Sequence, residues 1–103
     1  MNKARRKELT NISMKLEAIK DKLDSALSDL ENLKSELESV ADDEQEYLDN
    51  IPENLQSGER YEASEDACSN LEDALDSINS VLDGIDTDDL DEAISSIDEA
   101  ASV

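Results

Sequence analysis

The residues in this chain that could carry chemistry are its carboxylates. The last third, Leu71–Val103, holds eleven acidic residues and no Lys or Arg. Carboxylates can exchange protons with a substrate, hold divalent cations, or present negative charge to a basic partner. Proton exchange needs a raised pKa in a dry pocket, which nothing here predicts, and the chain has no His. We therefore expect no catalytic residue, no metal site, no cofactor and no enzyme activity.

Two smaller features do not change that expectation. The lone Cys68 falls on an apolar position without a His to activate it, so we expect a buried structural thiol in a reducing compartment. The acidic segment around Gly84 lacks the ligand spacing of a calcium-binding EF-hand loop. Its acidic residues instead suit the first turn of a helix, where the helix dipole favours negative charge.

A seven-residue repeat predicts the element that carries the first half of the chain. Apolar residues recur at alternating spacings of three and four, the a/d pattern of a coiled coil, if Leu9 is taken as position a. They are Leu9, Ile12, Leu16, Ile19, Leu23, Ala26, Leu30, Leu33, Leu37 and Val40. The repeat predicts one helix from about residue 3 to about 49. Pro52 ends it, because the residue before a proline avoids the helical region, and residues 50–58 are expected to form a reversing loop.

A second apolar run predicts that the chain turns back on itself. It comprises Tyr61, Ser64, Cys68, Leu71, Leu75, Ile78, Leu82 and Ile85. This run predicts a helix over about 59–83 with Gly84 as a left-handed cap, followed by a third helix over about 87–101. The fold is therefore expected to be all-α and a single domain over 1–103. We expect a long antiparallel helical hairpin and coiled coil, in which one long helix is lined by two shorter ones.

The chain must bury more apolar surface than a two-helix hairpin offers. A second apolar strip follows e positions of the first helix and flanks the seam of the second: Leu27, Ala41, Leu48, Ala67, Ala74 and Val81. This strip predicts self-association of two hairpins into a four-helix bundle, and so a homodimer. The alternative is a single long stripe that is satisfied within one chain.

Charge is distributed unevenly along the predicted hairpin. Residues 1–22 carry a net charge of +4, whereas residues 23–103 carry −24, because Lys34 and Arg60 are the only bases after residue 22. The expected register lays the acidic third helix beside the basic N-terminal segment, so part of the negative charge is neutralised internally. This pairing also explains the basic segment better than nucleic-acid binding does, since phosphates would be repelled by a net charge of −20.

The acidic residues of the predicted second helix have no such counterpart. Seven recur at helical spacing opposite the apolar seam: Glu62, Glu65, Asp66, Glu72, Asp73, Asp76 and Asp83. One interpretation is an ordinary solvated surface. Solvated helices usually mix Lys with Glu, because pairs four residues apart stabilise the helix while like charges repel. The other interpretation is therefore a surface displayed for a basic partner.

Location and origin are predicted from separate features. The basic N-terminus is not followed by an apolar run, and no window is long enough to span a membrane. We therefore expect a soluble cytoplasmic protein with no membrane partner. The segments "MNKARRKELTNISMKLEAIKDKLDSALSDL", "NIPENLQSGERYEASEDA" and "NLEDALDSINSVLD" resemble small acidic helical proteins of bacteriophages and prophages. The turn "IPENLQ…ER" is the most specific part of the resemblance.

The resemblance implies a phage origin and a bacterial host cytoplasm, but no catalytic activity. By charge and size the chain is similar to phage proteins that block host defence by mimicking nucleic acid. The expected partner is then a basic, nucleic-acid-binding host protein rather than nucleic acid itself. The alternative hypothesis is a structural coiled-coil assembly or scaffold protein, whose apolar strip is the working surface and whose charge keeps it in solution.

Overall fold

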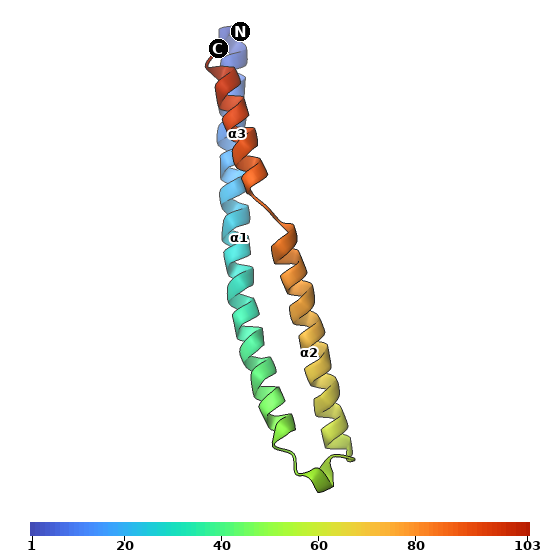
Figure 1. The fold of residues 1–103 in the computed structure, drawn as a ribbon. Helices are drawn as coiled ribbons and strands as arrows, with labels where there is room; N and C mark the ends of the chain where they lie inside the picture. Colours follow the sequence, from blue (N-terminus) through green and yellow to red (C-terminus); the bar gives the residue numbers. More distant parts are fainter. The chain divides into compact units, whose positions relative to one another are not determined.

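The computed structural model describes residues 1–103 and contains helices without strands (Figure 1). They are α1 (Lys3–Asp49), the short 3-10 helix η1 (Glu53–Leu55), α2 (Glu59–Gly84) and α3 (Asp88–Ala101). The prediction of an all-α helical hairpin is confirmed. The chain divides into two compact units that share α1. Unit 1 comprises Met1–Ser28 and Ile85–Val103, and unit 2 comprises Asp29–Gly84.

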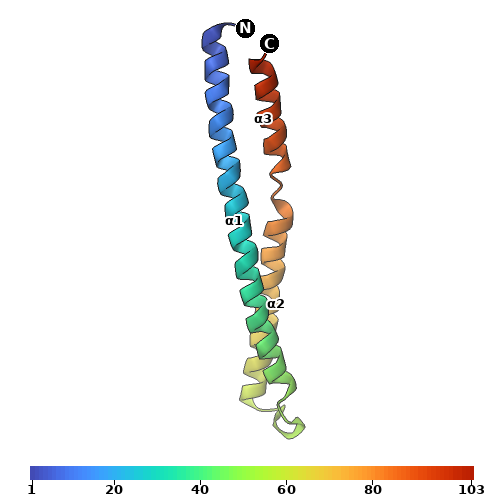
Figure 2. The same cartoon turned by 90° about the vertical axis from the view of Figure 1, so that its left-hand side faces the viewer.

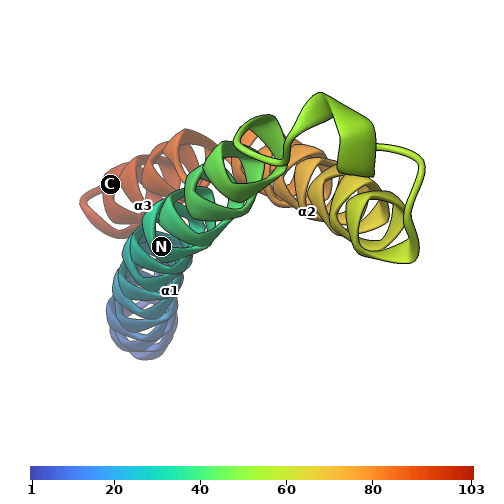
Figure 3. The same cartoon turned by 90° about the horizontal axis from the view of Figure 1, so that it is seen from below.

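Local interactions account for the two ends of α1. The side-chain Oδ1 of Asn2 accepts a hydrogen bond from the backbone N–H of Arg5 at 2.8 Å, which satisfies one of the free donors of the first turn. The helix ends at Asp49, shortly before Pro52. Pro52 has a φ of −57° and a ψ of 144°, and this ψ lies outside the helical region. The chain then passes through η1, in the turn nearest the viewer in Figure 3.

Unit 2 is a hairpin of the second half of α1 with the antiparallel helix α2 (Figure 2). Its buried apolar residues are Leu48 and Ile51, at 8% and 9% exposure. Ser64 is buried as well, and its hydroxyl donates a hydrogen bond of 2.8 Å to Oε1 of Glu44. Glu44 interrupts the apolar repeat at an a position, and this bond explains how a carboxylate is accommodated there.

Unit 1 pairs the first half of α1 with the antiparallel helix α3, so both chain termini lie at the same end of the unit (Figures 1 and 2). The apolar residues of α3 turn toward α1 and are half-buried; they include Leu90, Ile94 and Ile97. Buried Ser13 donates a hydrogen bond of 2.6 Å to Oδ1 of Asp98. Each unit thus contains one buried serine that donates to a carboxylate of the opposing helix.

The break between α2 and α3 differs from the prediction. No glycine has a positive φ, so the left-handed cap predicted at Gly84 is absent and α2 continues through this residue. The entry to α3 is made instead by Asp86, whose Oδ1 accepts a hydrogen bond of 2.8 Å from the backbone N–H of Asp88. This local bond of a side-chain carboxylate at the entry to α3 agrees with the sequence, which favours Asp86 or Thr87 as the cap of the third helix.

The face of α1 that packs differs from the predicted one: it uses positions a and e of the seven-residue repeat, where positions a and d were expected. We call the α1 residues that share one position of the seven-residue repeat a row, so that row a contains Leu9 and every seventh residue after it. In both units the residues of row a are largely half-buried, and the residues of row e lie with them on the packed face. Row d is exposed, by 45–58% at Ile12, Ile19, Leu33, Val40 and Tyr47. Row e supplies Leu48 to the core and Ser13 to the opposing carboxylate, contacts that row d does not make. Packing therefore follows rows a and e, and row d remains an apolar surface.

This offset changes the place of the predicted self-association strip. Leu27 and Ala41 are half-buried and Leu48 is buried, so these three e residues pack within their own units. On α2, Ala67 is half-buried, whereas Ala74 and Val81 are exposed. The exposed apolar surface of α1 is consequently row d, not the e row to which the sequence assigns self-association.

Candidate partner-binding surface

The negative charge is concentrated in unit 2. Unit 1 contains seven basic and eleven acidic residues, a net charge of −4, and unit 2 contains two basic and eighteen acidic residues, a net charge of −16. The basic residues of unit 1 come from α1 and most of its acidic residues from α3. Unit 1 is therefore close to balanced, and unit 2 accounts for most of the charge of the chain.

The ion pairs follow the same division. In unit 1, Nζ of Lys20 lies 3.1 Å from Oδ1 of Asp91 and 3.4 Å from Oδ2 of Asp24. The hydrogen bond to Asp91, followed by that to Asp24, raises the pKa of Lys20 above its usual value. The only ion pair in unit 2 joins Lys34 to Glu38 along α1, at 3.7 Å. The bond to Asp91 is the one ion pair that joins α3 to the basic N-terminal segment.

The seven acidic residues predicted as a partner-binding surface all lie on α2, and we name them the α2 acidic face. All seven are exposed and none takes part in an ion pair: Glu62, Glu65, Asp66, Glu72, Asp73, Asp76 and Asp83. With Glu59, eight acidic residues occupy the 26 residues of α2, or one carboxylate per ~5 Å of helix at a rise of 1.5 Å. A DNA strand carries one phosphate per ~3.4 Å. The two charge densities are comparable.

Cys68 lies on the inner side of α2 and has a free, half-buried thiol. Burial raises the pKa of this thiol, and the carboxylates of Glu44, Asp49 and Glu72 raise it further. Each cause disfavours the thiolate, which is the nucleophilic form of cysteine. The thiol therefore behaves as a packing group rather than as an activated nucleophile.

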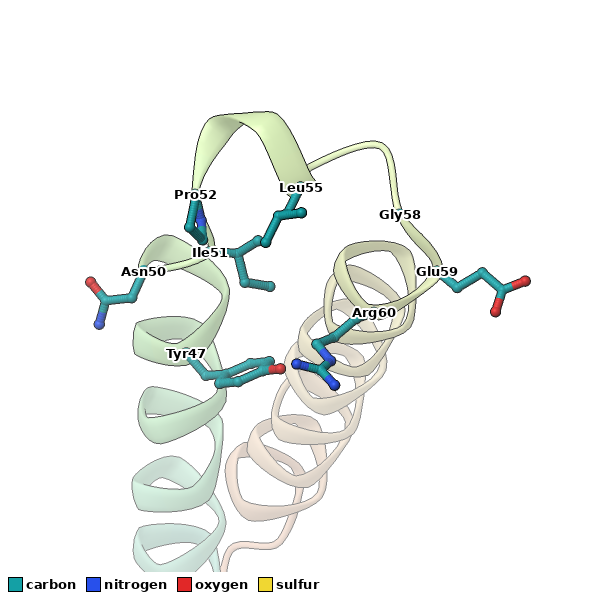
Figure 4. A pocket seen from close by; sticks show the side chains of 8 residues that line it. All are labelled: Tyr47, Asn50, Ile51, Pro52, Leu55, Gly58, Glu59 and Arg60. Atoms are coloured by element: carbon teal, nitrogen blue, oxygen red, sulfur yellow. The ribbon is translucent and has the colours of Figure 1, made fainter.

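A hollow with a volume of about 460 Å³ lies at the turn between α1 and α2. Figure 4 shows Tyr47, Ile51 and Leu55 facing the hollow and the guanidinium group of Arg60 directed toward the Tyr47 hydroxyl. The side chains of Asn50 and Glu59 point away from it. A small-molecule site usually has several polar groups converging on the ligand, and Arg60 is the one charged group directed here. The hollow is best described as an apolar recess beside an exposed tyrosine.

Two further features are absent from the structure. No group of three or more His, Cys, Asp or Glu side chains is arranged to hold a metal ion. No helix combines the length and the apolar character needed to cross a membrane.

Comparison with known proteins gives no match, either to a family model or to a curated protein or solved structure. The resemblance to phage proteins therefore stays a prediction. Sequence analysis missed two groups of residues, the exposed row d of α1 and the pair of Glu44 with Ser64. A Glu at an a position opposite a Ser in the seam was the available signal for the second.

Proposed function

We propose that this chain is an acidic binding protein that occupies the basic groove of a nucleic-acid-binding protein and thereby inhibits it. The observation that carries the proposal is the segregation of charge: eighteen acidic residues and two basic residues in unit 2. A helix gains a few tenths of a kcal/mol from each exposed Glu–Lys pair. The α2 acidic face has no such pair, so its composition is not explained by helix stability.

The chemistry of such a partner follows from the surface. Exposed carboxylates at a spacing close to that of phosphates would pair with Lys and Arg side chains that otherwise bind a nucleic-acid backbone. Association between opposite charges is accelerated at low ionic strength and weakened by salt. In line with the resemblance described above, the proposed partner is a basic defence protein of a bacterial host, and the proposed setting is an infected cytoplasm.

The proposal is tested by competition with nucleic acid. The purified protein is immobilised, exposed to nuclease-treated bacterial lysate at 0.1 M NaCl, and washed at constant ionic strength with short duplex DNA. We expect DNA to release the retained proteins, because both ligands need the same basic groove. The matched control wash is a neutral polymer at the same mass concentration. Retained proteins that duplex DNA does not release would contradict nucleic-acid mimicry.

A structural coiled-coil or scaffold protein is the second candidate function. The observation that favours it is the exposed apolar row d on α1, where Leu33 is 58% exposed. In that case the apolar row would carry the activity, and substitutions in the α2 acidic face would leave assembly unchanged. The two candidates thus place the functional residues on different helices.

A further inference from the structure

The exposed row d of α1 is regular in both units. Its apolar members are Ile12, Ile19, Ala26, Leu33, Val40 and Tyr47, each seven residues from the next. The structure leaves every one of them exposed, although α1 already packs on α2 or α3 through rows a and e. A strict seven-residue row of this kind is characteristic of a helix that meets another helix along its length. Row d has no such partner within either unit.

Two hollows along row d have the composition of coiled-coil holes. In unit 1 a hollow of about 340 Å³ is lined mainly by Arg5, Glu8, Leu9 and Ile12. In unit 2 a hollow of about 360 Å³ is lined by Leu33, Glu36, Leu37 and Val40 of α1, with Ile78 of α2 at its border. Both sets occupy heptad positions d, g, a and d. Four residues arranged in this way form the hole that receives a knob from a facing helix, so the same receptor geometry recurs in the two units.

The order of charges along α1 identifies the facing helix. Residues 3–28 carry a net charge of +3, and residues 29–49 carry −8. The first turn of α1 has no acidic residue and the last turn no basic residue, so this order opposes the helix dipole and does not stabilise an isolated α1. A second α1 running in the opposite direction would place +3 against −8 twice. A parallel pair would place like charges together throughout.

Row g lies beside row d, on the side away from row a. Its charges specify how two antiparallel α1 helices align along their length. It reads Glu8, Lys15, Lys22, Asp29, Glu36 and Asp43. If two antiparallel α1 helices cross at Asp29, Lys22 lies opposite Glu36 of the second copy and Lys15 opposite its Asp43. Two-fold symmetry repeats both pairs, giving four ion pairs. The single mismatch is Asp29, which meets its own counterpart on the axis.

The same alignment brings the apolar residues of row d into register to within one residue. Ala26 lies opposite Leu33 of the second copy, so the smallest member of the row meets a larger one. Ile19 then lies opposite Val40, and Ile12 opposite Tyr47. From these observations we infer that row d is a dimer interface, at which α1 of a second copy of this chain packs antiparallel with its two-fold axis at Asp29.

The interface makes a four-helix assembly in which each α1 contacts its own α2 or α3 through rows a and e and the second α1 through rows d and g. It differs from the surface that the sequence predicts, because Leu27, Ala41 and Leu48 stay inside their own units. The inference does not rest on nucleic-acid mimicry, since the α2 acidic face is not part of this interface.

Oligomeric state tests the surface. Sedimentation equilibrium at 0.15 M NaCl is expected to give twice the chain mass of 11.4 kDa for the unmodified protein. The double substitution Leu33→Gln with Val40→Thr should give a monomer with helical circular dichroism retained. The matched control is Val81→Thr, which changes an exposed valine of α2 and should leave the dimer intact. A monomeric parent protein at 100 μM would overturn the inference, as would a dimer that tolerates the double substitution but not Val81→Thr.

Cross-linking tests the orientation. In a Cys68→Ser background, Asp29→Cys should be joined to its own copy by a short bis-maleimide, because it lies on the two-fold axis. Lys15→Cys should not cross-link to itself, but should cross-link when mixed with Asp43→Cys. Self-cross-linking of Lys15→Cys would indicate a parallel pair and overturn the proposal. Reversal of the two lysines, Lys15→Glu with Lys22→Glu, should weaken dimerisation at least tenfold, and Glu36→Lys with Asp43→Lys should restore it.

Discussion

Replacing Ser64 by alanine tests how a carboxylate is accommodated in the seam of unit 2. Ser64 is 4% exposed, and its hydroxyl donates a 2.8 Å hydrogen bond to Oε1 of Glu44. Ser64→Ala removes the donor and leaves the Glu44 carboxylate at the helix interface without it. The change is small in volume, so its effect on the free energy of unfolding reports mainly on the bond.

The expected loss of stability is about 1–2 kcal/mol. A hydrogen bond to a charged group contributes about 1.5–3 kcal/mol, and Glu44 is half-buried, so water recovers part of that bond. Alanine has a higher helix propensity than serine by a few tenths of a kcal/mol. Ser77→Ala, at an exposed position of α2, measures this second contribution and serves as the matched control. For a chain of this size each kcal/mol shifts the melting temperature by about 4–8 °C.

Urea unfolding at fixed protein concentration provides the assay, since self-association makes apparent stability depend on concentration. The double variant Ser64→Ala with Glu44→Leu should recover most of the loss, because replacing both polar partners by apolar groups removes the unpaired carboxylate. If Ser64→Ala is no less stable than Ser77→Ala, the bond contributes nothing and the reasoning is refuted.

Four further predictions follow from burial and charge. Leu48→Asp should abolish helical circular dichroism by burying an unpaired charge at a cost of about 3–5 kcal/mol, whereas Leu33→Asp, at an exposed site, should retain it; equal loss in both would contradict the burial pattern. The melting temperature should rise between 0.02 and 0.5 M NaCl, because salt screens the repulsion within unit 2, and a fall would mean that internal ion pairs dominate. Alkylation of Cys68 at pH 8 should be slow because its pKa is raised, and Glu44→Gln should accelerate it; an unchanged rate would remove Glu44 as a cause. The raised pKa values of Cys68 and Lys20 mean that the folded state binds their protons more tightly than the unfolded state does. The resulting contribution to the free energy of unfolding is complete below the ordinary pKa values of 9.0 and 10.5 and is lost as pH rises through the pKa values of the folded state. An alkaline unfolding titration measures this loss.

The helical hairpin could be predicted because its signals are local. The repeat that begins at Leu9 specifies an uninterrupted helix, and Pro52 specifies its end within a few residues. The stripe of α3, including Leu90 and Ile97, is half-buried as its spacing indicates. These features depend on residues three and four apart, which share a helix face whatever lies opposite.

The row that packs could not be predicted from periodicity. Rows d and e both border row a, and each offers apolar residues, such as Val40 in d and Leu48 in e. The choice depends on side chains of the opposing helix, including the carboxylate of Asp98 that accepts from Ser13. The exposure of the α2 acidic face could be predicted because its residues lie opposite the apolar seam of the helix. That none of them makes an ion pair depends on which carboxylates the few lysines contact, and periodicity does not determine this.

The most direct test of the central claim compares two variants that carry the same charge change in different units. The first replaces Glu65, Asp66, Glu72, Asp73 and Asp76 of the α2 acidic face with the corresponding amides. The second replaces five exposed acidic residues of unit 1 that make no ion pair in the same way: Glu8, Glu17, Asp21, Glu92 and Glu99.

The measurement is the dissociation constant of each variant for a partner released by duplex DNA, determined across a series of salt concentrations. Desolvated charge pairs at an interface cost about 2–5 kcal/mol each when one partner is lost. We therefore predict that the α2 variant binds at least 100-fold more weakly, with a shallower salt dependence, while the unit 1 variant stays within about threefold of the parent protein. Equal weakening of both variants would mean that net charge alone drives binding. An α2 variant that binds as tightly as the parent protein would contradict the claim that the α2 acidic face is the functional surface.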